Sequence, residues 1–117
     1  MHAYVARLAG RERLIIPAHA MLESFAVLTR MPVRLSPEDA RRLLQESFFE
    51  SAKVASLAGD AAWDTIQELS LRDMGGGIIY DAVIARTAFD AGASVLLTWN
   101  IKDFLRVAPP GLAIRQP

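Results

Sequence analysis

The stretch Ala93-Ser94-Val95-Leu96-Leu97-Thr98-Trp99-Asn100 decides the fold class. Its first five residues form a continuous apolar run of strand length, which is typical of a parallel strand covered by helices on both faces. An apolar helical pattern at 78–91 precedes the run, and Gly92 is expected to end that helix. A short helix around 103–105 and a last strand at 112–114 are expected to follow. This alternation predicts an α/β domain.

The sequence before this stretch repeats the alternation. Residues 13–16 predict a strand that Pro17 closes, because proline is excluded from strand interiors but suits the first turn of a helix. The following helix, 18–30, is apolar nearly all round, which is typical of a helix packed against a sheet. Ser36-Pro37-Glu38-Asp39 supplies an N-cap, a proline and first-turn acids, so a further helix is expected to about residue 49.

The other elements are signalled less strongly. Residues 53–57 form a weak strand candidate, and an amphipathic helix is expected from Gly59 to the glycines at 75–77. The spacing of apolar residues in 1–8 is helical, so this segment is interpreted as the end of a short helix. Together these patterns predict a three-layer α/β/α fold with a mainly parallel sheet, formed by residues 1–117 as a single domain.

Composition excludes several classes of protein. The chain has 117 residues with 52% hydrophobic and 22% charged side chains, which is too apolar for a disordered segment. Its apolar runs stay below the roughly 18 residues that a membrane span needs, so no membrane partner is expected. Because 13 basic residues balance 13 acidic ones, any binding of nucleic acid must come from a local patch. The absence of cysteine excludes disulfides and thiolate chemistry and agrees with a cytoplasmic location.

Two acids are isolated on otherwise apolar helices. Glu23 is the only charge between Pro17 and Arg30, and Asp81 is the only charge between Asp73 and Arg86. An ionised carboxylate in such a setting needs a compensating partner, because desolvation costs several kcal/mol. One interpretation is structural, with each acid near backbone N–H groups or an arginine. The other is that both acids converge with a third on a divalent metal. The residues alone leave both open.

The third acid is expected in the loop that follows the apolar strand. Thr98 and Asn100 leave the carboxyl end of that strand, where polar residues mark the site in α/β folds, and Asp103 comes three residues later. Asp103 would then be a metal ligand, with Asn100 and Thr98 orienting a ligand or water. The alternative is an ordinary strand-to-helix loop in which Asp103 is a helix cap.

Three segments in this order resemble PIN-domain ribonucleases, most of all the VapC toxins of type II toxin-antitoxin systems: Ile16-Pro17-Ala18-His19-Ala20-Met21-Leu22-Glu23, Ile79-Tyr80-Asp81-Ala82-Val83-Ile84-Ala85 and Leu97-Thr98-Trp99-Asn100-Ile101-Lys102-Asp103-Phe104. The resemblance implies an endoribonuclease that depends on Mg²⁺ or Mn²⁺ and hydrolyses RNA. It implies Glu23, Asp81 and Asp103 as catalytic and metal-site residues, Asn100 at a position that is often Asp, and Thr98 as a supporting hydroxyl. It also implies a cognate antitoxin and a homodimer, for which an exposed apolar strip is expected between helix 18–30 and the helix after Ser36.

One feature departs from the family pattern. PIN domains begin with a central strand that ends in an Asp ligand, and this sequence has no counterpart, so its start resembles a chain shortened by about 25 residues at ordinary element sizes. The strands near Ile15 and Leu96 would then lack their shared neighbour, and nuclease activity would be impaired. A non-catalytic PIN remnant that binds an antitoxin or dimerises is the alternative function, and an unrelated α/β domain with structural acids is the third.

Overall fold

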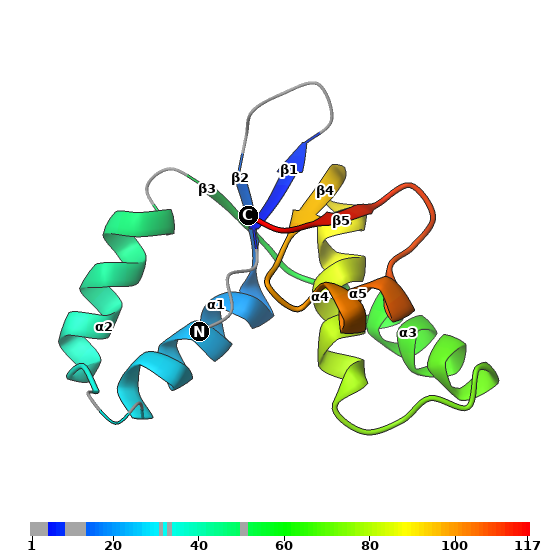
Figure 1. Ribbon diagram of the computed structural model, residues 1–117, viewed down its shortest axis with the longest axis horizontal. Helices are drawn as coiled ribbons and strands as arrows, with labels where there is room; N and C mark the ends of the chain where they lie inside the picture. The colour runs from blue at the N-terminus through cyan, green and yellow to red at the C-terminus, as the bar shows by residue number, and fades with distance from the viewer. Residues whose placement is uncertain (1–4, 9–13, 31, 33, 50–51) are drawn as a thin grey trace.

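The sheet has five strands in the order β3-β2-β1-β4-β5 (Figure 1). The computed structural model describes residues 5–8, 14–30, 32, 34–49 and 52–117. Their elements are β1 (Val5–Leu8), β2 (Leu14–Pro17), α1 (Ala18–Arg30), α2 (Pro37–Leu44), the π-helical turn η1 (Gln45–Phe49), β3 (Ala52–Ala55), α3 (Gly59–Leu71), α4 (Ile78–Asp90), β4 (Ala93–Leu97), α5 (Ile101–Val107) and β5 (Ala113–Arg115).

Four of the five strands point in one direction. β2 pairs with β3 and β4 pairs with β5 in parallel, while β1 runs antiparallel to both β2 and β4. The predicted α/β class with a mainly parallel sheet is therefore confirmed. As a consequence, the carboxyl ends of β2 and β4 lie at the same edge of the sheet, where α/β folds place their binding crevices.

The N-terminal segment differs from its prediction. The described part of the expected helix, Val5–Leu8, is a strand, and residues 1–4 lie outside the described residues. Ala6 lies opposite Ile15 of β2 and opposite Leu96 of β4, so the slot between these strands is filled and the expectation of unpaired inner strands is wrong. The physical reason is that an inner slot offers main-chain partners on both sides, and this pairing outweighs a short helical pattern.

The core lies where α4 and α5 meet the sheet. Ile15, Ile84, Leu96 and Phe104 are fully buried, and α4 contacts β2, β4 and α5. The nearly all-round apolar pattern of α4 is explained by this central position. Gly92 ends the helix with a φ of +94°, a conformation in which a side chain is strained, so its predicted role as the stop is confirmed.

Helix α1 is only partly covered, although its apolar pattern resembles that of α4. Ala20 and Leu28 are buried, but Leu22 is 64% exposed and Phe25 is 38% exposed. The expectation that the whole helix packs against the sheet is therefore wrong. Figure 1 shows α2 on the β3 side of the sheet, away from α3, α4 and α5, and α1 lies between α2 and α4 and contacts both. No helix in the described ranges has the length and apolar character needed to cross a membrane.

Helix α2 begins as its sequence predicts. The backbone N–H of Asp39 donates to the Ser36 side-chain oxygen at 3.1 Å, so Ser36 is the N-cap. Further along, Arg41 donates to both carboxylate oxygens of Glu38, at 2.6 and 3.0 Å. This hydrogen bond and the charge of Arg41 hold the pKa of Glu38 below its ordinary value. Arg41 is therefore fixed along the α2 surface, next to the exposed apolar residues of α1.

Candidate functional site

Two of the three predicted acids line one hollow. The hollow has a volume of about 430 Å³ and is bordered by His19 and Glu23 of α1, by Gly77, and by Tyr80 and Asp81 of α4. Glu23 and Asp81 come from segments 58 residues apart in sequence, the difference 81 − 23. The convergence of these two acids with Asp103 was one of the two interpretations that the sequence left open, and the structure brings Glu23 and Asp81 to the same hollow.

The start of each helix explains why the two acids meet. Helix α1 begins directly after Pro17, the last residue of β2, so Glu23 lies in the second turn beyond the carboxyl edge of the sheet. Helix α4 begins at Ile78, and Asp81 lies in its first turn, where the positive end of the helix dipole favours a carboxylate. Both acids are partly buried, and both line the hollow.

His19 connects the two helices at this hollow. Its Nε2 lies 3.0 Å from Glu23 Oε1, across one helical turn of α1. Its ring stacks on that of Tyr80, with centroids 5.1 Å apart and planes 5° from parallel. The sequence patterns did not single out His19 as a site residue. Its spacing of four residues from Glu23 was the signal that could have identified it.

The loop after β4 forms a second, separate group. Thr98 is fully buried, its backbone N–H donates to the Arg115 carbonyl at 2.9 Å, and its Oγ1 accepts the Asn100 N–H at 3.0 Å. The Asn100 side-chain amide donates to Asp103 Oδ2 at 3.0 Å, and Arg106 Nη1 lies 4.0 Å from Asp103 Oδ1. Thr98 therefore holds the loop in place, and Asn100 is the residue before α5, whose first turn contains Asp103.

The structure thus divides the predicted site residues into two groups. Asp103 is not among the residues that line the hollow of Glu23 and Asp81. Within the described part of the chain, no group of three or more histidine, aspartate or glutamate side chains is placed to hold a metal ion. Two carboxylates nevertheless suit Mg²⁺, which is commonly bound by one or two carboxylates together with waters and substrate phosphates. The donors of the hollow therefore fit a divalent ion.

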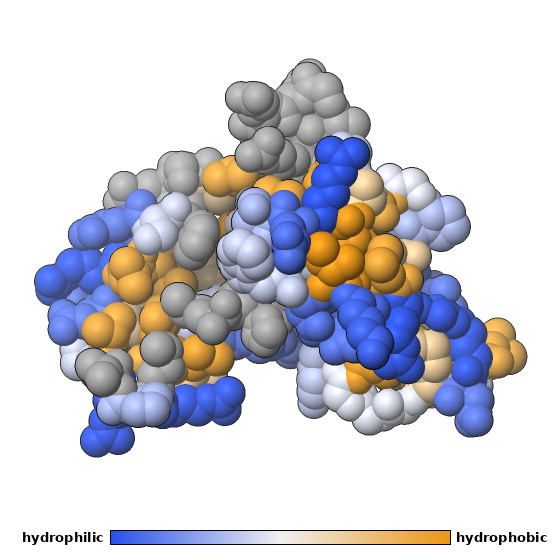
Figure 2. All heavy atoms as spheres, in the orientation of Figure 1, coloured by the Kyte–Doolittle hydropathy of each residue, from blue (hydrophilic) through white to orange (hydrophobic). Residues whose placement is uncertain are grey.

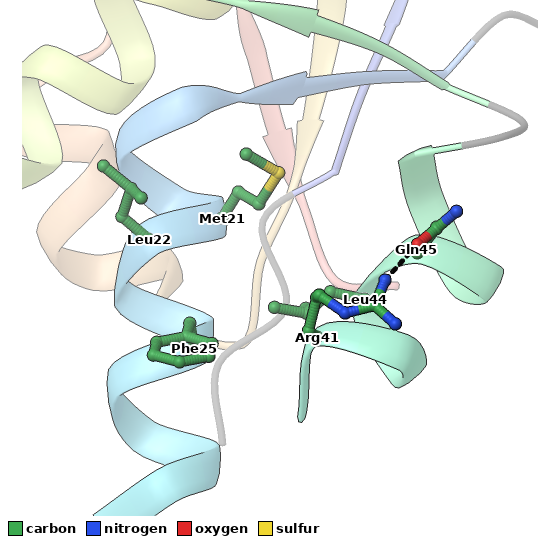
Figure 3. Close-up of a pocket in the computed structure, with 6 residues that line it drawn as sticks. All are labelled: Met21, Leu22, Phe25, Arg41, Leu44 and Gln45. Carbon is green, nitrogen blue, oxygen red and sulfur yellow. Dashed lines mark hydrogen bonds between the residues drawn. The ribbon is translucent and has the colours of Figure 1, made fainter. Parts of the chain in front are cut away.

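An apolar groove lies between α1 and α2 (Figure 3). It has a volume of about 370 Å³ and is lined by Met21, Leu22, Phe25, Arg41, Leu44 and Gln45. Arg41 donates a hydrogen bond to the Gln45 side-chain oxygen, so these two residues together form a polar edge of the groove. Figure 2 shows hydrophobic side chains gathered over these two helices. The exposed apolar strip expected between the two helices is thereby confirmed.

The chain belongs to the PIN domain family, whose model matches residues 1–109. This agrees with the α/β sheet and with the two acids beyond its carboxyl edge. The chain is 37% identical to Ribonuclease VapC27 of Mycobacterium tuberculosis over 95 residues, which cover 80% of this chain and 66% of that protein. It is 33% identical to Ribonuclease VapC40 of the same species over 81 residues, which cover 68% of this chain and 59% of that protein.

These relatives confirm the resemblance to VapC-type PIN ribonucleases that the sequence motifs indicated. The matched region is just under two thirds of the length of VapC27 and a smaller share of VapC40. No solved structure matches the chain significantly. The family membership therefore rests on the family match and these curated relatives.

Proposed function

We propose that the chain acts as a VapC-type endoribonuclease that hydrolyses RNA phosphodiester bonds with a divalent metal ion, Mg²⁺ or Mn²⁺. The observation that carries the proposal is that Glu23 and Asp81 line the same hollow of a PIN domain. The structural alternative, in which each acid serves only to stabilise its own helix, gives no reason for the two to share a hollow. A cytoplasmic location remains a prediction that goes with this function.

Glu23 and Asp81 are the residues that would hold the ion. When bound, such an ion supplies a Lewis acid that activates water and stabilises charge on the phosphodiester oxygens. Two like charges in one hollow repel each other, and a cation relieves that repulsion. The open side of the hollow, next to Gly77 where no side chain intrudes, leaves room for the backbone of a substrate. The carboxylates would thus bind the ion and orient RNA relative to it.

Asp103, Asn100 and Thr98 keep their predicted roles as a proposal. Asp103 would contribute a further metal-site carboxylate, with Asn100 beside it as a ligand or orienting amide and Thr98 as the supporting hydroxyl. The Asn100 side-chain amide donates a hydrogen bond to Asp103 and so orients its carboxylate. This supports a role for both residues at the metal site, since such hydrogen bonds orient metal ligands. The common edge of β2 and β4 also supports it, since both helices that follow these strands start there.

The dependence on a metal ion tests the proposed activity directly. We expect the purified chain to cleave a fluorescently labelled single-stranded RNA with Mn²⁺ or Mg²⁺ and to lose cleavage on addition of EDTA. Glu23→Gln removes a charge at the hollow and should abolish most of the activity. Glu46→Gln, the same change on the exposed side of η1, should leave it intact, so that the loss confined to Glu23→Gln excludes a contaminating nuclease. Equal activity of the two variants would contradict the assignment of Glu23.

A non-catalytic binding module is the second candidate function. It is favoured by the absence of a three-residue metal cluster among the described residues and by β1, which occupies the centre of the sheet without contributing an acid. The expected impairment of nuclease activity, for lack of an Asp on the central strand, would likewise favour this second function. A chain that binds a partner but cleaves no RNA with either ion would establish this second function instead of the first.

We propose that the groove between α1 and α2 holds an apolar segment of an antitoxin. A labelled amphipathic peptide with leucines at helical spacing and one arginine serves as the probe. Phe25→Asp places a charge in the groove and should weaken binding of the peptide at least tenfold, because a buried aromatic anchor contributes about 2 kcal/mol or more. Leu71→Asp makes the same change on an exposed leucine of α3 and should have little effect.

The competing occupant of the groove is a second copy of this chain, as the predicted homodimer would require. Sedimentation of the chain without peptide distinguishes the two. If the chain is a dimer that Phe25→Asp converts to a monomer, the groove is a dimer interface and the antitoxin proposal for this surface is wrong. If Phe25→Asp leaves the mass unchanged but abolishes peptide binding, the antitoxin proposal holds.

A further inference from the structure

His19 contacts one residue of its own helix, Glu23, and one residue of α4, Tyr80. One nitrogen of the imidazole contacts Glu23 at 3.0 Å, and the ring face lies parallel to Tyr80 of the other helix. A carboxylate oxygen only accepts hydrogen bonds, so His19 Nε2 carries the proton in this contact. Both residues that it touches line the hollow, and Tyr80 directly precedes Asp81 in sequence.

We infer that His19 is a positioning residue that sets the orientation of the Glu23 carboxylate toward a divalent ion in the hollow. This inference rests on the proposed function, because it assumes that Glu23 holds the ion. The N–H of His19 occupies one carboxylate oxygen, Oε1, and leaves the second oxygen for the ion. Tyr80 fixes the plane of the imidazole, so that the donor points at Glu23 rather than rotating into solvent.

The geometry favours positioning over a purely structural contact. Glu23 has several rotatable bonds and, without a partner, would point into water in many conformations. The donor comes from its own helix, whereas the stacked ring comes from α4, so one side chain links the two elements that carry the acids. Hydrogen bonds of this kind behind a metal ligand typically change metal affinity or activity 10–100-fold when removed.

Two substitutions separate the hydrogen bond from the ring. His19→Phe keeps an aromatic ring against Tyr80 but has no N–H donor, and His19→Gln keeps an N–H donor at a similar reach but has no ring. The affinity of the full chain for Mn²⁺ is measured by calorimetry, and the unfolding temperature without metal is measured alongside. We expect His19→Phe to weaken Mn²⁺ binding about 10–100-fold. His19→Gln should retain most of the affinity.

Each other outcome overturns the inference. If His19→Phe binds Mn²⁺ as tightly as the original chain, the hydrogen bond does not position Glu23. If His19→Phe and His19→Gln lose the same affinity, an N–H donor at this position does not restore Mn²⁺ binding, so the hydrogen bond is not what positions Glu23. Glu23→Gln in the same titration separates this failure from that of the proposed function. If Glu23→Gln also leaves Mn²⁺ binding unchanged, Glu23 is not a ligand and the metal-site proposal fails together with the inference.

Discussion

Phe104→Ala is expected to lower the free energy of unfolding by about 3–5 kcal/mol, the range for truncating a buried phenylalanine. Phe104 is fully buried in the core cluster, on a helix that contacts both α4 and β5. Removing its ring leaves a cavity that the surrounding helices and strands cannot fill without moving. Because a domain has about 5–15 kcal/mol of total stability, this single change would bring the chain close to unfolding.

Urea denaturation followed by circular dichroism measures this loss. The matched control is Leu105→Ala, which removes a large apolar side chain from the next residue of α5, where it is 61% exposed. Substitutions at such exposed positions usually change stability by within about 0.5 kcal/mol. A loss in Leu105→Ala as large as that in Phe104→Ala would show that α5 is packed on its other face instead.

The order and type of most elements could be predicted because their boundaries have a local physical cause. Pro17 ends β2 and precedes α1. Ser36 caps α2 through a hydrogen bond to a residue only three positions further along the chain. Gly92 adopts a φ that other residues avoid. Each of these causes acts within one turn of chain, so it can be recognised without knowledge of the tertiary structure.

Burial of the helices could not be predicted in the same way. α1 and α4 have similar apolar patterns, but α4 lies against β2 and β4, whereas Leu22 and Phe25 of α1 remain exposed beside α2. A pattern records which side chains are apolar and does not record what covers them. The same limit explains β1, whose strand state depends on two neighbouring strands that a local window does not contain.

The candidate site was predictable where isolation of a charge was the signal. Glu23 is the only charge between Pro17 and Arg30 and Asp81 the only one between Asp73 and Arg86, and both line one hollow. Asp103 gave no such signal, because its position depends on hydrogen bonds of the loop that starts at the buried Thr98. His19 was missed because its importance lies in a stacking partner from another helix, Tyr80.

Asp81→Asn is expected to reduce metal-dependent RNA cleavage by at least about 100-fold, because an active-site ion contributes several kcal/mol of transition-state stabilisation. The substitution keeps the shape of the side chain and removes the charge that would hold the ion. Asp64→Asn, on the exposed surface of α3, is the matched control and should cleave at the original rate. Rates are measured at saturating Mn²⁺ and again at limiting Mn²⁺.

Asp103→Asn in the same assay tests whether the two groups of acids act together. If Asp103 holds the ion, its loss should equal that of Asp81→Asn and should lessen as the Mn²⁺ concentration rises, because excess ion compensates for a weakened ligand set. If Asp103 only anchors the Asn100 loop, its loss should be small and independent of Mn²⁺. The proposed role of Asp103 as a further metal-site carboxylate makes the larger, Mn²⁺-dependent loss the expected result, and the smaller loss would contradict that role. A loss equal to that of Asp81→Asn would mean that the α5 start closes toward the hollow when ion and RNA bind.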